Sequence, residues 1–329
     1  MTKILVVRYS ALGDVVLATS VLDPLLERFP GARIEWVTDP LYAPLLEGLP
    51  QLAAVHGLTR EGAGAAIGLR ERLRRRFDLA IDLQHKVRSR LIARAAAPER
   101  VTFRRRTPRR ALLALLGSDP PLARAHATEL YAEALAPLGV EGPGPLRIHL
   151  SRQAQALAAD ALARARPPIV AIAPGARWAT KRWPPERFAE VADALAAEGA
   201  SIVLAGGPAD RDAFAAVRAT LHAPVAADLS PLPIDALAAA LARVQLLVAC
   251  DSGPVHLASA VGTPALALFG PTSTVRWGPP APGRAVSLGL ACSPCSNHGG
   301  ELCPQGHHRC LADLAPEAVL AAAREMLRR

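Results

Sequence analysis

One acidic side chain near the start of the chain has the type and placement of a catalytic base. Asp14 follows the apolar run Ile4–Val7 at a point where a strand is expected to turn into a helix. Gly13 would permit a tight backbone turn there. A carboxylate at the mouth of a helix can accept a proton from a substrate, and it can equally cap the helix. The sequence leaves both interpretations of Asp14 open.

A later stretch combines glycine with a lysine in a way that suits phosphate binding. Residues 173–184 contain Gly175 and Lys181 in front of an expected helix, where backbone N–H groups and an ammonium would lie together. The chain has only three lysines among its 38 basic residues, so a lysine here indicates a role for a compact charge. A solvated Lys-Arg pair is the alternative.

A third stretch, Asp251-Ser252-Gly253, follows an apolar strand and opens a helix. The N–H groups of Ser252 and Gly253 would lie at the positive end of that helix, which suits a diphosphate. His256 falls on the first helical turn, where it could reach the ligand or pack beneath the loop. No Gly-x-Gly-x-x-Gly follows an expected strand and no P-loop motif is present, which argues against nicotinamide enzymes and P-loop nucleotidases.

Four cysteines crowd one short segment near the end of the chain, interleaved with histidines, glycines and prolines. They are Cys292, Cys295, Cys303 and Cys310. In a cytosolic protein such crowding predicts a metal site before it predicts disulfides, and four thiolates suit tetrahedral zinc or iron. A set of reduced thiols in a loop is the alternative. The fifth cysteine, Cys250, is expected in the core at a strand end.

Short apolar runs and helical patterns alternate along the chain and must position these groups. The expected strands are 3–8, 33–37, 78–83, 100–103, 169–173, 201–205, 245–249 and 265–269. The expected helices are 15–28, 63–76, 151–164, 184–198, 208–221, 234–243 and 255–261. Such alternation predicts parallel sheets covered by helices on both faces. The expected fold class is α/β, with two Rossmann-like domains facing a central cleft.

A Pro/Gly-rich break at residues 142–145 divides the chain. We expect an N-terminal domain over residues 1–150, a linker helix over 151–166, and a C-terminal domain over 167–329 that includes the cysteines and a C-terminal helix. Because ligands bind beyond the carboxyl ends of the strands in such sheets, the stretches described above are expected to line the cleft.

The net charge of +9 belongs to the first half of the chain. Residues 1–166 hold 25 basic and 16 acidic side chains, whereas the second half holds 13 of each. Residues 60–110 alone hold 16 basic and five acidic side chains, a field that would gather an anionic partner. This stretch includes Arg88, Arg104, Arg105 and Arg106. It contains only two aromatic residues, a poor stacking platform, which argues against nucleic acid as the partner.

No apolar stretch predicts a signal segment or a membrane span. The run Ile4–Val7 is too short for a signal segment, and the uncharged stretch 254–275 is broken by glycines and prolines. We therefore expect a cytoplasmic protein, with peripheral attachment to the inner face of the inner membrane as a further possibility.

Taken together, the motifs resemble glycosyltransferase family nine, the bacterial ADP-heptose:lipopolysaccharide heptosyltransferases. The resemblance runs almost from end to end. Its carriers are Ile4–Asp14, Asp82-Leu83-Gln84 with Arg88-Ser89, residues 174–176 with 181–184, Gly206-Gly207-Pro208, residues 251–258 and residues 269–272. It implies a GT-B fold with an N-terminal acceptor domain and a C-terminal nucleotide-sugar domain.

The resemblance also implies a reaction, the inverting transfer of heptose from ADP-L-glycero-D-manno-heptose to the lipid A–Kdo inner core of lipopolysaccharide. Asp14 would be the general base, and Arg88 with Arg104–Arg106 would bind the anionic glycolipid acceptor. The implied donor-binding residues are Gly13, Gly175, Lys181, Asp251, Ser252, Gly253 and His256. No cofactor is implied for catalysis, because lysine and helix ends would hold the departing diphosphate.

Two other functions are the alternatives to this reaction, and the second is the less favoured. One is a GT-B transferase or epimerase that uses another nucleotide sugar, and the bound nucleotide would separate it from a heptosyltransferase. The other is a basic nucleic-acid-binding protein, which a salt-sensitive gel shift would reveal.

Overall fold

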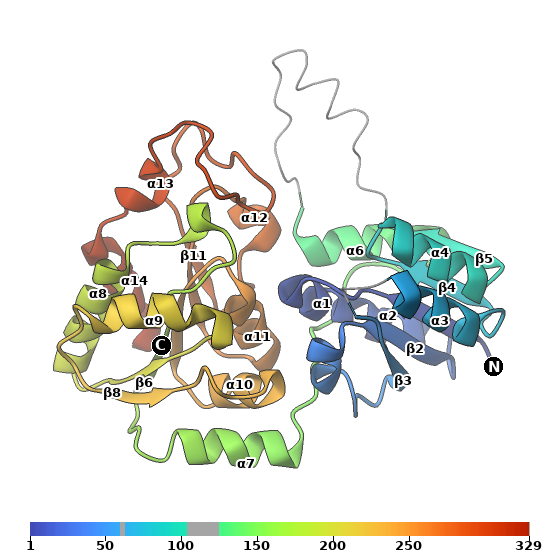
Figure 1. The fold of residues 1–329 in the computed structure, drawn as a ribbon, viewed down its shortest axis with the longest axis horizontal. Coiled ribbons are helices and arrows are strands. Elements are labelled where there is room, and N and C mark those ends of the chain that lie inside the picture. The colour runs from blue at the N-terminus through green and yellow to red at the C-terminus, as the bar shows by residue number, and fades with distance from the viewer. Residues whose placement is uncertain (60–62, 104–124, 329) are drawn as a thin grey trace. The chain divides into compact units, whose positions relative to one another are not determined.

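The computed structural model describes residues 1–59, 63–103 and 125–328. The chain divides into two compact units, one reaching His149 and the other continuing from Leu150. Each unit contains one parallel sheet with helices around it (Figure 1). The predicted acceptor residues Arg104, Arg105 and Arg106 lie outside the described residues.

The described sheet of the first unit has five parallel strands in the order β3-β2-β1-β4-β5. They are β1 (Lys3–Val7), β2 (Arg33–Thr38), β3 (Leu52–Gly57), β4 (Leu79–Asp82) and β5 (Glu99–Thr102). Residues Ile4–Val7 of the central strand are fully buried, as a strand covered on both faces must be. Val7 pairs with Val37 on one side and with Asp82 on the other, so the segments that follow β1 and β4 start side by side.

The helices of the first unit pack in two groups. Helices α3 and α4 contact each other and contribute Leu69, Leu73 and Ile92 to a core cluster with β1, whereas α6 contacts α1. The helical elements are α1 (Leu12–Ala18), η1 (Thr19–Val21), α2 (Leu22–Arg28), η2 (Pro40–Leu45), α3 (Ala63–Leu73), α4 (Val87–Ala96), α6 (Ala127–Leu135) and η3 (Ala136–Leu138).

The single helix predicted over 15–28 is in fact three short helical segments. The hydroxyls of Thr19 and Ser20 donate to the carbonyls of Val16 and Leu17, three residues earlier in each case. Such side-chain bonds compete with the regular helical ladder, and Pro24 cannot donate to that ladder at all. The 3-10 turn η1 between α1 and α2 follows from this local chemistry.

The described sheet of the second unit has six parallel strands in the order β11-β10-β9-β6-β7-β8. They are β6 (Ile169–Ala173), β7 (Ser201–Leu204), β8 (Val225–Asp228), β9 (Leu246–Cys250), β10 (Ala265–Leu268) and β11 (Arg284–Val286). Every residue of β6, β9 and β10 is buried, again as expected for central parallel strands.

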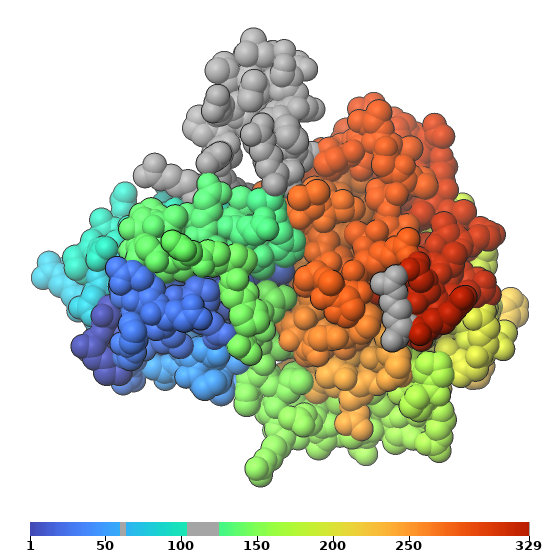
Figure 2. Space-filling view, turned by 180° about the vertical axis from the view of Figure 1, so that it is seen from behind, coloured from blue at the N-terminus to red at the C-terminus, as the bar shows by residue number. Residues whose placement is uncertain are grey.

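Helices of the second unit also form two groups. Helix α8 contacts α9 and α14, whereas α10 contacts α11 and α7, the helix predicted as a linker. The helical elements are α7 (Arg152–Ala161), η4 (Ala179–Lys181), α8 (Pro185–Ala197), η5 (Pro208–Asp210), α9 (Arg211–Arg218), α10 (Ile234–Leu241), α11 (Gly253–Val261), α12 (Thr274–Trp277), α13 (Arg309–Ala312) and α14 (Pro316–Leu327). Residues 270–310, in orange to red, form part of the surface of this unit in Figure 2.

Three strands that the sequence patterns did not predict, β3, β8 and β11, are edge strands of the two sheets. Among the described residues, no helix is long and apolar enough to cross a membrane.

Candidate functional site

Asp14 lies in the first turn of α1, just beyond the carboxyl end of β1. Its Oδ1 lies 2.5 Å from Nη2 of Arg8 and accepts a hydrogen bond from the Tyr131 hydroxyl at 2.8 Å. Its Oδ2 accepts the N–H of Ala11 at 3.4 Å, a long contact. Capping of α1 therefore accounts for only part of what this carboxylate does, and two side chains from other elements fix its position.

Arg8 is the buried cation of this cluster. Its side chain is 4% exposed, and its guanidinium donates to the carbonyl of Leu83 and lies over the ring of Tyr131. Burial alone would lower the pKa of Arg8, but the Asp14 carboxylate reverses this effect and raises it above its ordinary value. The arginine therefore stays charged, and a charged arginine at this distance favours the ionised form of a carboxylate.

Gln84 holds the segment between β1 and Asp14 in place. Its Oε1 accepts the N–H groups of Tyr9 and Ser10 at 3.1 Å each, and its Nε2 donates to the Ser10 hydroxyl. Gln84 is itself anchored by Asp82, whose Oδ1 accepts the Gln84 N–H at 3.0 Å. Burial raises the pKa of Asp82, which also accepts a bond from Ser89. The Asp-Leu-Gln motif, which begins at the last residue of β4, thus positions the chain that leads to Asp14.

Arg88, predicted as an acceptor ligand, lies in the first turn of α4. Its Nη2 donates to the carbonyl of Thr59 at 3.0 Å. Burial raises the pKa of Tyr9, and the charge of Arg88 acts against this increase, which indicates that the two side chains are close. The described part of the predicted acceptor site therefore adjoins the segment that precedes Asp14.

In the second unit, Lys181 and Asp251 come together from separate stretches of the sequence. Lys181 Nζ lies 2.7 Å from Asp251 Oδ2, and the two side chains are 14% and 5% exposed. The Thr272 hydroxyl donates to the same carboxylate oxygen at 2.6 Å. The three residues follow β6, β9 and β10, which are neighbouring parallel strands, so their carboxyl ends meet at one edge of the sheet.

The start of α11 adjoins this pair, and the Asp-Ser-Gly motif joins β9 to this helix, as predicted. Ser252 is the residue before the helix, but its hydroxyl donates to the carbonyl of Cys250 at 3.1 Å and does not cap the helix. Gly253 is the first helical residue. His256 is only 5% exposed, which agrees with packing beneath the loop.

The two glycines predicted at the site have other surroundings than expected. Gly13 is the second residue of α1, so the tight turn predicted there is wrong. Gly175 lies against Asp210, and a Cβ at this position would overlap the Asp210 carboxylate. The same carboxylate accepts the N–H of Gly207 at 2.8 Å. Close packing against Asp210 therefore explains the glycine at position 175.

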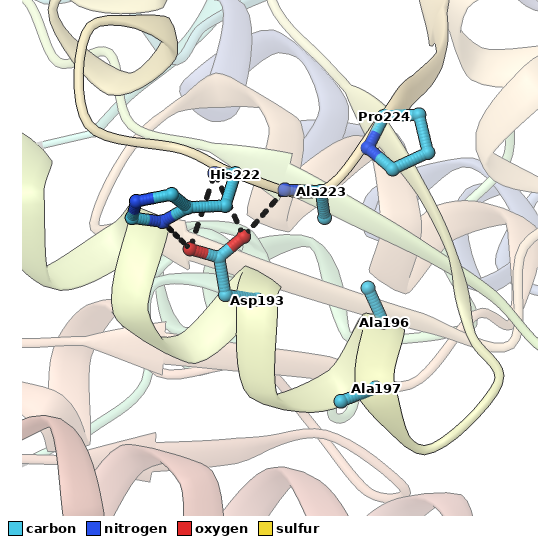
Figure 3. Close-up of a pocket in the computed structure, with 6 residues that line it drawn as sticks. All are labelled: Asp193, Ala196, Ala197, His222, Ala223 and Pro224. Carbon is cyan, nitrogen blue, oxygen red and sulfur yellow. Dashed lines mark hydrogen bonds and ion pairs between the residues drawn. The ribbon is translucent and has the colours of Figure 1, made fainter.

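A shallow pocket elsewhere on the second unit includes neither Asp14 and its partners nor the Lys181–Asp251 pair. Its lining residues are Asp193, Ala196, Ala197, His222, Ala223 and Pro224. The Asp193 carboxylate points to the backbone of the chain before β8 and accepts the N–H of Ala223 at 2.7 Å and that of His222 at 3.0 Å (Figure 3). It fastens α8 to this chain segment, which is a structural role.

Residues 67–305 match the sequence profile of glycosyltransferase family 9 (heptosyltransferase). The chain belongs to this family. Lipopolysaccharide heptosyltransferase 1 of Pseudomonas aeruginosa is 31% identical over 98% of this chain and 94% of its own length. Lipopolysaccharide heptosyltransferase 2 of Salmonella typhimurium is 28% identical over 99% of this chain and 98% of that protein. The protein is therefore a glycosyltransferase of the heptosyltransferase family, as its motifs predicted.

Solved structures of the family share the fold. A family 9 glycosyltransferase from Veillonella parvula superposes with a TM-score of 0.85 at 24% identity, covering 99% of this chain and 97% of that one. The ADP-heptose heptosyltransferase II of Escherichia coli gives a TM-score of 0.74 at 24% identity, over 99% and 98% of the two chains. The predicted GT-B fold class with two parallel α/β sheets is confirmed.

The cysteine segment of this heptosyltransferase does not have the geometry of the predicted metal site. Among the described residues, no group of three or more His, Cys, Asp or Glu side chains is placed to hold a metal ion. The thiols are nevertheless neighbours: burial and the charges of the other three cysteines raise the pKa of Cys310 to about 11. A structure of TibC, described as an iron-containing glycosyltransferase of Escherichia coli, has a TM-score of 0.60 at 17% identity and shows a shared fold only. The metal prediction is not supported by this geometry.

The fifth cysteine is a core residue, as predicted. Cys250 is the last residue of β9 and has no exposed surface. Burial raises the pKa of its thiol to about 12, so it stays neutral.

The residues that sequence reasoning missed are Arg8, Tyr131 and Thr272. Arg8 directly follows β1 and Thr272 ends the motif 269–272, so their positions could have indicated a role. Tyr131 lies on α6, and no motif in the surrounding sequence marks it.

Proposed function

We propose that this heptosyltransferase transfers a heptose from ADP-L-glycero-D-manno-heptose to a hydroxyl of the lipid A–Kdo inner core, with inversion at the anomeric carbon. The observation that carries the proposal is the Asp14 carboxylate, fixed beyond the end of β1 by Arg8 and Tyr131. The nearly full-length similarity to lipopolysaccharide heptosyltransferases supports the choice of substrates.

In this proposal Asp14 is the general base. The acceptor oxygen bonds to the anomeric carbon as the bond from that carbon to the diphosphate oxygen breaks, and ADP leaves with the electron pair. The hydroxyl proton passes to Asp14. A carboxylate held within reach of the proton accelerates such a reaction about 10²- to 10⁴-fold. A weak base is sufficient, because the hydroxyl becomes acidic as its oxygen forms the new bond.

The donor diphosphate binds Lys181 in this proposal. An ammonium has three N–H donors, so Lys181 can keep its contact with Asp251 and still donate to phosphate oxygens. The N–H groups at the start of α11 add further donors. These groups oppose the negative charge that develops on the departing ADP, and the proposed transfer needs no further cofactor.

The acceptor is an anionic glycolipid, and the surface of α4 supports a location at a lipid surface. Val87 and Leu91 lie one helical turn apart and are 65% and 47% exposed. Arg90 and Arg94 on the same helix are exposed as well. Apolar side chains flanked by arginines suit anionic headgroups. We therefore propose peripheral attachment to the cytoplasmic face of the inner membrane.

A panel of nucleotide sugars tests the donor. ADP-heptose, UDP-sugars and GDP-sugars are added to the purified protein, and the unfolding temperature is recorded with each. A ligand at 100 times its dissociation constant adds about 2.7 kcal/mol of stability. We expect a response to ADP-heptose and heptose transfer to a lipid A–Kdo acceptor. A response to UDP-sugars alone would overturn the proposal in favour of another nucleotide-sugar enzyme.

A further inference from the structure

The cysteine segment, residues 292–310, touches both loops that hold the Lys181–Asp251 pair. Near its start, the N–H groups of Cys295 and Ser296 donate to the carbonyl of Pro271 at 3.0 and 2.8 Å. The residue after Pro271 is Thr272, which donates to Asp251. One end of the segment is thus fixed to the loop that supports the carboxylate of the pair.

Near its other end, the segment binds the residue that precedes the lysine. Thr180 is 5% exposed, and its N–H and hydroxyl donate to the carbonyl of Gly300 at 3.1 and 2.8 Å. The Thr180 hydroxyl also accepts the Gly300 N–H at 2.9 Å. The Thr180 carbonyl accepts a bond from Nε2 of His308 at 2.7 Å. The backbone leading into Lys181 is therefore held from two points of the segment.

The segment also packs directly on the side chain of Lys181. A Cβ on Gly299 would lie 2.8 Å from Cγ and 2.9 Å from Cδ of Lys181, closer than real Cβ contacts. Gly299 has a φ of +87°, a conformation that glycine adopts without strain. The lysine stem therefore lies in a space that only a glycine at position 299 leaves open.

We propose that Thr180, Gly299 and His308 are positioning residues that fix the Lys181 ammonium beside Asp251 before the donor binds. This inference rests on the proposed function of Lys181 as the ligand of the donor diphosphate. A mobile lysine loses side-chain entropy when it binds a phosphate, and a lysine held in advance loses less, so it binds more tightly. The cysteine segment thereby sets the donor affinity of the second unit.

The variant Gly299→Ala tests this with a matched control. Its methyl group must displace the stem of Lys181, and we expect ADP to bind about tenfold more weakly by calorimetry. Gly289 also has a positive φ, +62°, but no atom lies within 4 Å of its Cβ position. Gly289→Ala therefore imposes similar backbone strain without touching the lysine and should bind ADP normally. Equal ADP affinities for the two variants would overturn the proposal.

Thr180 provides a second test that does not depend on backbone strain. Thr180→Val removes the hydroxyl bonds to Gly300, and Thr180→Ser keeps them. We expect the valine variant to raise the KM for the donor several-fold with little change in the KM for the acceptor, and the serine variant to restore the original value. If both variants behave alike, the hydroxyl has no positioning role.

Lys181→Met separates failure of this inference from failure of the proposed function. If the methionine variant binds ADP normally, the donor site itself is wrong. If it binds ADP weakly while Gly299→Ala binds normally, only the positioning inference fails. Combining the two substitutions tests whether Gly299 acts through the lysine: the double variant should then bind ADP no more weakly than Lys181→Met alone, and additive losses would contradict the inference.

Discussion

Arg8 and Asp14 form an ion pair of 2.5 Å at the carboxyl end of β1, in which the guanidinium is almost wholly buried and the carboxylate is 14% exposed. The arginine is itself held by the carbonyl of Leu83, after the neighbouring strand β4. A carboxylate that would otherwise only cap α1 is thus fixed from two adjacent strands. This fixed anion is the group on which the proposed reaction depends.

Asp14→Asn should abolish most of the turnover and leave donor binding intact. An amide cannot accept the hydroxyl proton, so we expect kcat to fall by about 10²- to 10⁴-fold. ADP affinity, measured by calorimetry, should not change, because the proposed diphosphate ligand lies in the other unit. Asp23→Asn is the control, since Asp23 also pairs with an arginine, Arg147 at 2.6 Å, but has no proposed role. Unchanged turnover in Asp14→Asn would remove the base assignment.

Tyr131→Phe should lower activity less severely. The variant loses the hydroxyl that donates to Asp14. It keeps the ring, which packs edge-on against Phe103 with the two ring centroids 5.4 Å apart. We expect kcat to fall roughly tenfold and the free energy of unfolding to fall by about 1 kcal/mol. Tyr42→Phe, at another buried tyrosine of the first unit, controls for loss of stability alone. Equal turnover for the two variants would mean that Tyr131 does not help to position Asp14.

Asp193 should make the stability of the second unit depend on pH at the acid end. Partial burial would raise the pKa of Asp193, but bonds from the His222 ring and from two backbone N–H groups lower it below the ordinary value. The folded state therefore favours the ionised carboxylate. This stabilisation is complete above the unfolded pKa, about 3.9, and is lost as the pH falls through the lower folded value.

The corresponding measurement compares the unfolding temperatures of the original protein and Asp193→Asn between pH 7 and pH 3. We expect a deficit for the variant at neutral pH that shrinks as the pH falls below about 4. Asp160→Asn, at an exposed position of α7, should show no such trend. A deficit that stays constant with pH would mean that the charge of Asp193 is not what stabilises the fold.

The exposed face of α4 should bind anionic vesicles. Replacing both Val87 and Leu91 by serine removes apolar side chains that could enter the headgroup region, and we expect partitioning onto such vesicles to fall about tenfold. Leu302→Ser is the control, because Leu302 is 85% exposed but lies in the cysteine segment. Vesicle sedimentation measures both. If the Leu302 variant loses as much vesicle binding as the α4 variant, the exposed face of α4 is not the surface that binds the lipid.

The central strands could be predicted from the sequence, whereas three of the four edge strands of the described sheets, β3, β8 and β11, could not. Strands such as β6 and β9 are buried on both faces and appear as continuous apolar runs. By contrast, β8 reads Val-Ala-Ala-Asp and is partly exposed along its length, and β3 includes His56 and Gly57. A strand with one partner and little burial leaves a weak pattern, so its pairing is decided by the sheet it joins.

The candidate site likewise combines residues that a nearby sequence motif marks with residues that only the fold brings together. Asp14, Lys181 and Asp251 were predicted because each follows a strand within a recognisable motif. Tyr131 was missed because it reaches Asp14 from a helix 117 positions later in the chain. The spacing of the cysteines predicted a metal site, but spacing says nothing of the distances between thiols, and the described geometry does not form one.

The bonds between Thr180 and residues 300 and 308 join parts of the chain that are 120 and 128 positions apart. During synthesis the lysine of the donor site is therefore made long before the segment that holds it. A nascent chain that has completed the first unit and β6 to β10 would still lack this support. On the proposed positioning, full affinity for the sugar nucleotide arises only after residues 299–308 have left the ribosome, so that shorter nascent chains hold the donor more weakly.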